Sequence, residues 1–84
     1  SLHRQLSGAL LKDSEDGSGV VIAEVDRNSR AAYVGLQPAD RIVSVNRFAV
    51  DNLKQLKQVV HDARRRLVLL IERNGSALYL TLSR

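Results

Sequence analysis

The sequence has no cysteine, methionine or tryptophan, and it has a single proline among its 84 residues. Without cysteine the chain cannot form a disulfide, a thiolate zinc site or a cysteine nucleophile. Its apolar runs are also much shorter than the roughly 18 residues that a membrane-spanning helix needs. The sequence therefore predicts no membrane span in this chain, and the stability of its fold must come from packing.

What remains is the composition of a small globular domain. The chain is 44% apolar and 26% charged, which fits neither a disordered protein nor a collagen. Its length predicts one domain over residues 1–84. The net charge of +4 would suit an acidic partner if the excess were clustered, and the densest basic run is residues 64–66. By contrast, Asp13, Glu15 and Asp16 make one early segment acidic.

Two segments have the signals of helices. Ser29 can cap a short helix over residues 30–34, and Gly35 can end that helix in a left-handed conformation. Asn52 and Gln55 have the spacing of a capping box. Apolar residues recur at helical intervals after it, which predicts one long amphipathic helix ending at residue 62 or 63.

The other apolar runs predict strands. They lie at residues 6–11, 20–25, 41–46, 48–50, 67–73 and 76–82. Residues 12–19 form a polar, turn-rich loop, and the pair Asn74 and Gly75 is typical of a type I′ hairpin turn. Alternation in the third run predicts that Ile42 faces differently from Val43 and Val45. The fold class is therefore α+β, with five or six strands in a partly open antiparallel barrel or sandwich, one long helix and one short helix.

No arrangement of residues indicates catalysis or metal binding. His61 and Asp62 are neighbours on the predicted long helix and point about 100° apart, so they cannot pair with each other. No serine lies in a Gly-x-Ser-x-Gly elbow. The acidic loop has its glycine and its later glutamate at the wrong positions for a calcium-binding EF-hand. We therefore expect no catalytic residue, no metal site and no cofactor.

A binding module fits the pattern better. A glycine-containing loop that enters a β-branched strand, with an amphipathic helix later in the chain, can present an open strand edge beside an apolar helix face. An extended peptide can add to such an edge, and backbone N–H groups of the loop can hold a carboxylate. A basic domain that binds RNA or phosphate through residues 64–66 is the alternative, but three aromatic residues offer little for base stacking.

The order of these segments is similar to a known family. The chain reads GVVIAEVDRNSRAAYVGLQPADRIVSVN, then DNLKQLKQVV at the start of the long helix, then LVLLIERNGSALYLTL. It resembles the PDZ domains of the bacterial HtrA/Deg serine proteases from residue 6 to residue 82. The resemblance is greatest to the second, C-terminal PDZ domain of DegQ- and DegP-like members.

The resemblance implies a fragment of a trypsin-like periplasmic endopeptidase that acts in protein quality control, with the Ser-His-Asp triad outside these residues. The fragment itself would be non-catalytic and would bind unfolded or C-terminal polypeptide segments, neighbouring subunits of an oligomer, or both. A PDZ domain of another processing protease, or a freestanding scaffold, is the alternative. The implied peptide-binding residues are a carboxylate-binding loop, a pairing strand over residues 20–25 and a helix wall: Gly17, Ser18, Gly19, Val20, Val21, Ile22, Leu53, Leu56 and Val60. Val59 could take the place of one of the wall residues.

Three departures from the family pattern affect these expectations. Ser18 replaces an apolar residue of the loop, and the acids before it would repel a carboxylate at low salt. These two changes favour subunit assembly, with residues 64–66 as a contact surface, over capture of chain ends. Ala39 stands where family members often have glycine. The fold should tolerate alanine at this position if Ala39 avoids a positive φ.

Overall fold

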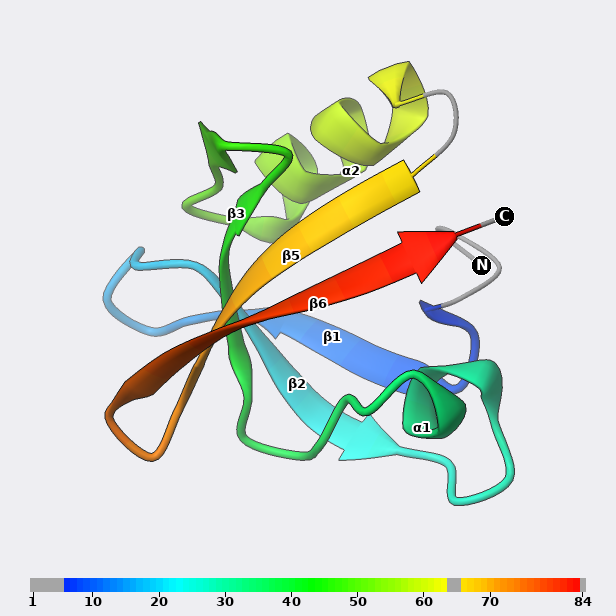
Figure 1. The fold of residues 1–84 in the computed structure, drawn as a ribbon. Helices are drawn as coiled ribbons and strands as arrows, with labels where there is room; N and C mark the ends of the chain where they lie inside the picture. Colours follow the sequence, from blue (N-terminus) through cyan, green and yellow to red (C-terminus); the bar gives the residue numbers. More distant parts are fainter. Residues whose placement is uncertain (1–5, 64–65, 84) are drawn as a thin grey trace.

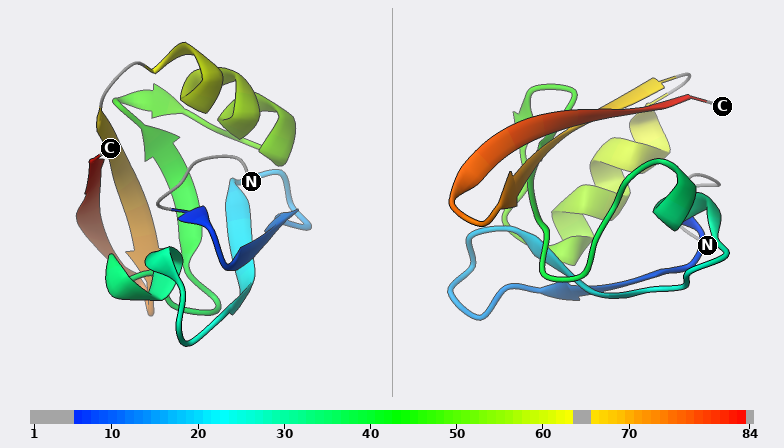
Figure 2. Two further views of the ribbon diagram at one scale, coloured as in Figure 1. Left: turned by 90° about the vertical axis from the view of Figure 1, so that its right-hand side faces the viewer. Right: turned by 60° about the horizontal axis from the view of Figure 1, so that its bottom comes forward.

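One antiparallel sheet of six strands, with two helices, is formed by residues 6–63 and 66–83, which the computed structural model describes (Figure 1). The strand order is β1-β2-β3-β5-β6, and β4 pairs with β3. The elements are β1 (Ala9–Asp13), β2 (Val20–Val25), α1 (Arg30–Tyr33), β3 (Arg41–Val45), β4 (Phe48–Ala49), α2 (Leu53–Asp62), β5 (Arg66–Arg73) and β6 (Ser76–Ser83). The sheet curves without closing (Figure 2), which confirms the predicted partly open α+β fold.

The long helix α2 begins where the capping box predicts. The side chain of Asn52 accepts a hydrogen bond of 2.9 Å from the backbone N–H of Gln55. In return, the Gln55 side chain accepts one of 2.7 Å from the N–H of Asp51. This reciprocal arrangement satisfies backbone donors that the first helical turn leaves without partners. It fixes the point at which α2 leaves the preceding loop.

Positive φ angles occur at the two turns for which the sequence predicts them. Gly35 follows the short helix α1 with a φ of 104°, and Asn74 and Gly75 have φ angles of 51° and 80° between β5 and β6. The last two values are those of a type I′ turn, whose twist matches that of the flanking strands. The hairpin pairs Arg73 with Ser76 and continues without a bulge along all of β6.

The expected alternation in β3 holds for Val43 but is wrong for Val45. Ile42 and Val45 are both fully buried, whereas Val43 is only half-buried. The register between β3 and β5 shifts between Ile42 and Ser44, so an extra residue is inserted into β3 at this point. Such a bulge reverses the alternation, and residues three apart then face the same side of the sheet.

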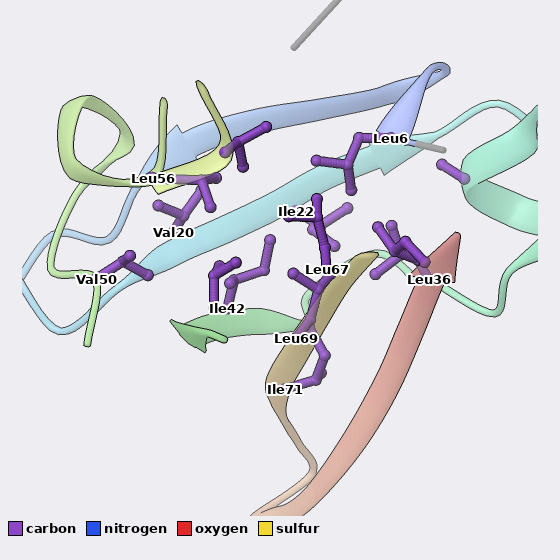
Figure 3. Close-up of a cluster of buried hydrophobic side chains, with 14 residues drawn as sticks. Leu6, Val20, Ile22, Leu36, Ile42, Val50, Leu56, Leu67, Leu69 and Ile71 are labelled. Atoms are coloured by element: carbon purple, nitrogen blue, oxygen red, sulfur yellow. The ribbon is translucent and has the colours of Figure 1, made fainter. Parts of the chain in front are cut away.

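The core lies between the curved sheet and α2 (Figure 3). It draws one or more side chains from β2, β3, β5, β6, α1 and α2, together with loop residues such as Leu36 and Val50. Leu56 and Val60 are the buried residues of α2. Because Leu56 has no exposed surface, it belongs to the core, and the expectation that it contacts a bound peptide is wrong.

One ion pair in the fold has a buried carboxylate, that of Asp40. Asp40 is 1% exposed and accepts hydrogen bonds of 2.8 Å from Nε and Nη2 of Arg73, one at each carboxylate oxygen. The backbone N–H of Gln37 donates a third bond to Asp40. The bonds to Asp40 raise the pKa of Arg73 above its ordinary value. The ion pair therefore joins the end of β5 to the loop that precedes β3.

Ala39 has a positive φ, contrary to the expectation from the sequence. Its φ is 75°, although its N–H donates a bond of 2.8 Å to the carbonyl of Ile22 and its side chain is exposed. A left-handed conformation costs an L-residue roughly 1–2 kcal/mol. The fold accepts this strain because the hydrogen bond to β2 holds the loop in place.

We therefore expect Ala39→Gly to stabilise the protein. Glycine adopts this conformation without strain, but it gains freedom in the unfolded chain, so the net increase in unfolding free energy should be about 0.5–1 kcal/mol. Urea denaturation would show a higher midpoint with an unchanged slope. Ala23→Gly within β2 is the matched control and should lower the midpoint, so a decrease for both variants would contradict the role given to φ at Ala39.

Candidate functional site

The strand predicted to receive a peptide lies inside the sheet. β2 pairs with β1 between Val20 and Val25, and its other side pairs with β3 at Val20 and Val21. On that side, Ile22 also exchanges backbone hydrogen bonds of 2.8 Å with Asp40 and Ala39. Val20 and Ile22 are fully buried, and Val21 is half-buried. The prediction of peptide pairing is therefore wrong for Val20, Val21 and Ile22, because the chain itself occupies both edges of β2 at these three residues.

The predicted carboxylate-binding loop has no backbone donors left for a ligand. The N–H of Gly17 donates to the carbonyl of Ser14 at 3.4 Å, and that of Ser18 donates to the Ser14 hydroxyl at 2.8 Å. The N–H of Gly19 donates to the carbonyl of Asp51 at 3.2 Å. A carboxylate would have to break these bonds. The assignment of Gly17, Ser18 and Gly19 to carboxylate binding is therefore wrong.

The acidic loop instead stabilises itself and the neighbouring sheet. Hydrogen bonds from Ser18 and then Ser14 lower the pKa of Asp16, whose carboxylate is exposed. The Ser18 hydroxyl also accepts a bond of 2.7 Å from Arg41 of β3, and Arg41 forms an ion pair with Glu72 of β5. The loop is thus a fixed connection between β1 and β2.

The open edge near α2 belongs to β1. Apart from the short β4, which pairs only with β3, the edge strands of the sheet are β1 and β6, which lie at opposite margins in the left view of Figure 2. The carboxylate of Asp13, at the end of β1, accepts a bond of 2.6 Å from the N–H of Leu53, the first residue of α2. This bond fixes one end of β1 against the start of the helix and leaves the unpaired edge of β1 beside α2.

Ser7 and Gly8 precede β1 at the other end of this edge. Ser7 and Gly8 use their carbonyls to accept bonds from Ala31 and Asp26, at 3.0 and 2.8 Å. Within residues 6–63 and 66–83, their N–H groups have no acceptor. Gly8 has a φ of 96°, a conformation that favours glycine and turns the chain into β1. Unpaired N–H groups before an open strand are donors that an anionic chain end can use.

Helix geometry identifies the side of α2 that faces this edge. Val59 and Ala63 line a hollow of about 260 Å³ with Phe48 of β4, so that side of α2 faces the β3–β4 turn. Successive helical residues are about 100° apart, which places Leu53 and Lys57 on the opposite side, with Val60 toward the core. Leu53 is half-buried, Val60 is 6% exposed and Lys57 is exposed. Of the predicted wall residues, Leu53 and Val60 are therefore near β1, while Val59 faces elsewhere.

Sequence reasoning missed Ser7, Gly8 and the half-buried β1 residues Ala9 and Leu11. One signal could have found them. Gly8 precedes the first predicted strand, and that strand is joined to the next by a long loop, so it can lie at an edge. Because residues 20–25 are apolar, β2 was predicted to be the strand that pairs with a peptide. Near-continuous apolarity, however, is typical of an interior strand.

Other expected features are placed as follows. His61 and Asp62 are both exposed at the end of α2. Within the described residues, no group of three His, Cys, Asp or Glu side chains could hold a metal ion. No helix among them is long and apolar enough to cross a membrane. Arg66 begins β5 and is exposed, while residues 64 and 65 of the predicted basic contact surface lie outside the described residues.

Comparison with known proteins connects this geometry to a family. The chain is 33% identical over 75 residues to the periplasmic serine endoprotease DegP of Salmonella typhimurium. It is 36% identical over 78 residues to the periplasmic pH-dependent serine endoprotease DegQ of Escherichia coli. These matches cover 89% of this chain, but only 16% and 17% of DegP and DegQ. The chain thus corresponds to a small part of each protease.

Solved structures give the same result. The PDZ domain of HtrA3, bound to the phage-derived ligand FGRWV, superimposes with a TM-score of 0.76 at 24% identity, over 90% of this chain and 80% of that one. The HtrA-type protease AlgW with a decapeptide gives 0.72 at 25% identity, over 90% and 27% of the two chains. The family model for PDZ domains matches residues 21–73. With that match and a sheet that leaves β1 open beside α2, the chain belongs to the PDZ domain family.

Proposed function

We propose that this chain is the non-catalytic peptide-binding module of an HtrA/Deg-type serine endopeptidase that acts in the periplasm. The observation that carries the proposal is the unpaired edge of β1 beside the Leu53 side of α2, with N–H groups at Ser7 and Gly8 that have no acceptor among the described residues. The names of DegP and DegQ support the protease and its location. In this proposal the catalytic triad lies elsewhere in the parent protein.

The charges near β1 favour one direction for a bound peptide. The end of β1 carries Asp13, and the loop after it carries Glu15 and Asp16, which would repel a terminal carboxylate. The start of β1 has the N–H groups of Ser7 and Gly8, which have no acceptor in the part of the chain that the structure describes. A peptide that pairs with β1 therefore places its C-terminus at Gly8 and runs antiparallel to β1. In this orientation the acidic loop does not oppose capture of a peptide C-terminus, because the loop follows the other end of β1.

An NMR titration of the labelled chain tests the proposal. A peptide with an apolar C-terminal residue should shift the amide signals of Ser7, Gly8, Leu11 and Leu53. The same peptide with a C-terminal amide should bind at least about tenfold more weakly, since it loses the charge that the free N–H groups stabilise. Equal affinities would contradict end capture, and shifts confined to other surfaces would contradict the β1 site.

A matched pair of charge-reversal variants gives a second test of the proposed peptide site. Lys57 lies on the side of α2 that faces β1, so Lys57→Glu should weaken binding of the free-acid peptide several-fold through repulsion of its backbone carbonyls and carboxylate. Lys54→Glu changes the net charge equally but lies farther around the helix, away from β1. Equal weakening by both variants would mean that only the net charge of the domain matters.

A further inference from the structure

One hydrogen bond joins the two elements that border the proposed peptide site. A carboxylate oxygen of Asp13, the last residue of β1, accepts a bond of 2.6 Å from the backbone N–H of Leu53, the first residue of α2. Within residues 6–63 and 66–83, no other hydrogen bond connects β1 with α2. The donor belongs to the backbone of Leu53, whose side chain lies on the side of α2 that faces β1. The bond therefore fixes where this wall residue lies relative to the open edge.

The strand end of the bond is held by the sheet and the core. Asp13 pairs with Val20 in the ladder between β1 and β2, and Val20 has no exposed surface. At the next position, the N–H of Ser14 donates a bond of 3.0 Å to the carbonyl of Gly19. Because the core around Val20 is closely packed, Asp13 cannot shift without disturbing the ladder or a core residue. Asp13 is thus a fixed point from which α2 can be positioned.

The other bonds at the start of α2 do not reach β1. The capping box connects Asn52, Gln55 and Asp51 with one another. The N–H of Gly19, in the loop after β1, donates a bond of 3.2 Å to the carbonyl of Asp51. These bonds hold the first turn of α2 together and attach it to the loop. Among the described residues, the spacing between β1 and α2 is set by a hydrogen bond at Asp13 alone.

We propose that Asp13 is a positioning residue of the peptide site, an inference that rests on the proposed function. Its carboxylate binds the N–H of Leu53, so it acts through α2 and not by contact with the peptide. A bound peptide must fit between β1 and the Leu53 side of α2. When the spacing of these two walls is fixed in advance, less conformational freedom is lost on binding, and the affinity is higher.

Loss of this bond should loosen the site without unfolding the domain. Asp13 is exposed, so water can accept a hydrogen bond from Leu53 once the carboxylate is absent. The bond between Gly19 and Asp51 still attaches the start of the helix to the loop. The buried residues of α2, Leu56 and Val60, still hold the helix on the core. An Asp13→Ala variant should therefore fold, with the spacing between α2 and β1 less well defined.

Peptide affinities of three variants test the proposal. Asp13→Ala should weaken binding of the free-acid peptide about three- to tenfold. Asp13→Asn removes the same charge but keeps an oxygen acceptor, so its affinity should stay within about twofold of that of the unchanged protein. Asn52→Ala is the matched control, since it removes a cap from the same helical turn but makes no bond to β1. Equal weakening by Asp13→Ala and Asn52→Ala would overturn the proposal, because helix capping alone would then explain the effect.

The absence of cysteine allows a readout that needs no peptide. Spin labels on Leu10→Cys in β1 and Lys54→Cys in α2 replace two exposed side chains, and the distances between the labels report the spacing of the walls. Asp13→Ala should broaden the distribution of these distances, whereas Asp13→Asn and Asn52→Ala should not.

The two readouts separate this inference from the function on which it rests. If the unchanged protein binds the peptide but Asp13→Ala alters neither the affinity nor the label distances, the role of Asp13 is overturned and the peptide site stands. If the unchanged protein does not bind the peptide, the proposed function is contradicted. The label distances then decide by themselves whether Asp13 positions α2.

Discussion

Gly8→Ala should lower the unfolding free energy of this domain by about 3 kcal/mol, because an added side chain has no room there. A Cβ atom at Gly8 would lie 2.0 Å from Cβ of Ser29 and 2.4 Å from its hydroxyl oxygen. Ser29 caps α1 by accepting a bond from Ala32, and its hydroxyl donates to the carbonyl of Asp26. Moving Ser29 to relieve the clash breaks this cap. The φ of 96° adds strain that only glycine avoids.

Thermal unfolding monitored by circular dichroism measures this effect. For a domain of this size, 3 kcal/mol corresponds to a decrease of roughly 10–20 °C in Tm. Gly17→Ala is the control, since Gly17 also has a positive φ, of 72°, but a Cβ there meets nothing within 4 Å. That variant should lose only about 1 kcal/mol, the cost of the left-handed conformation itself. Equal losses at both glycines would mean that strain, and not the clash with Ser29, accounts for the effect.

Asp40→Asn should destabilise the domain by a similar amount, about 3 kcal/mol, because it breaks a buried ion pair from one side. Both carboxylate oxygens of Asp40 accept bonds from Arg73, and one also accepts from the N–H of Gln37. An amide can place an acceptor toward only one of the two guanidinium nitrogens and would face the other with its own N–H₂ group. The partly buried side chain of Arg73, which is 23% exposed, then loses the carboxylate that compensates its charge.

Urea denaturation compares this variant with Glu72→Gln. The ion pair of Glu72 with Arg41 is partly exposed, with side chains 42% and 34% accessible, so its loss should cost less than about 1 kcal/mol. A large difference between the two variants is the expected result. If Asp40→Asn unfolded at the same urea concentration as Glu72→Gln, the ion pair at Asp40 would not be a stabilising part of the core.

Local patterns in the sequence predicted most of the fold. The capping box at Asn52, the glycine that ends α1 and the turn at Asn74 and Gly75 all depend on residues within a few positions of one another. Short-range hydrogen bonds and φ preferences determine such features, so they can be predicted from the sequence alone. Local pattern could not place the bulge after Ile42, because a register shift depends on pairing with β5, which is almost thirty residues later.

The sequence by itself therefore determined the fold class, the family and the helix that borders the site. Only the tertiary structure decided which strand is open. Val20–Val25 and Ala9–Asp13 are both apolar enough to be strands, and position in the sheet is set by long-range pairing: β3 covers β2, while nothing in the described chain covers β1. In the folded chain the N–H groups of Gly17 and Ser18 donate to Ser14 and that of Gly19 donates to Asp51, whereas those of Ser7 and Gly8 have no acceptor among the described residues.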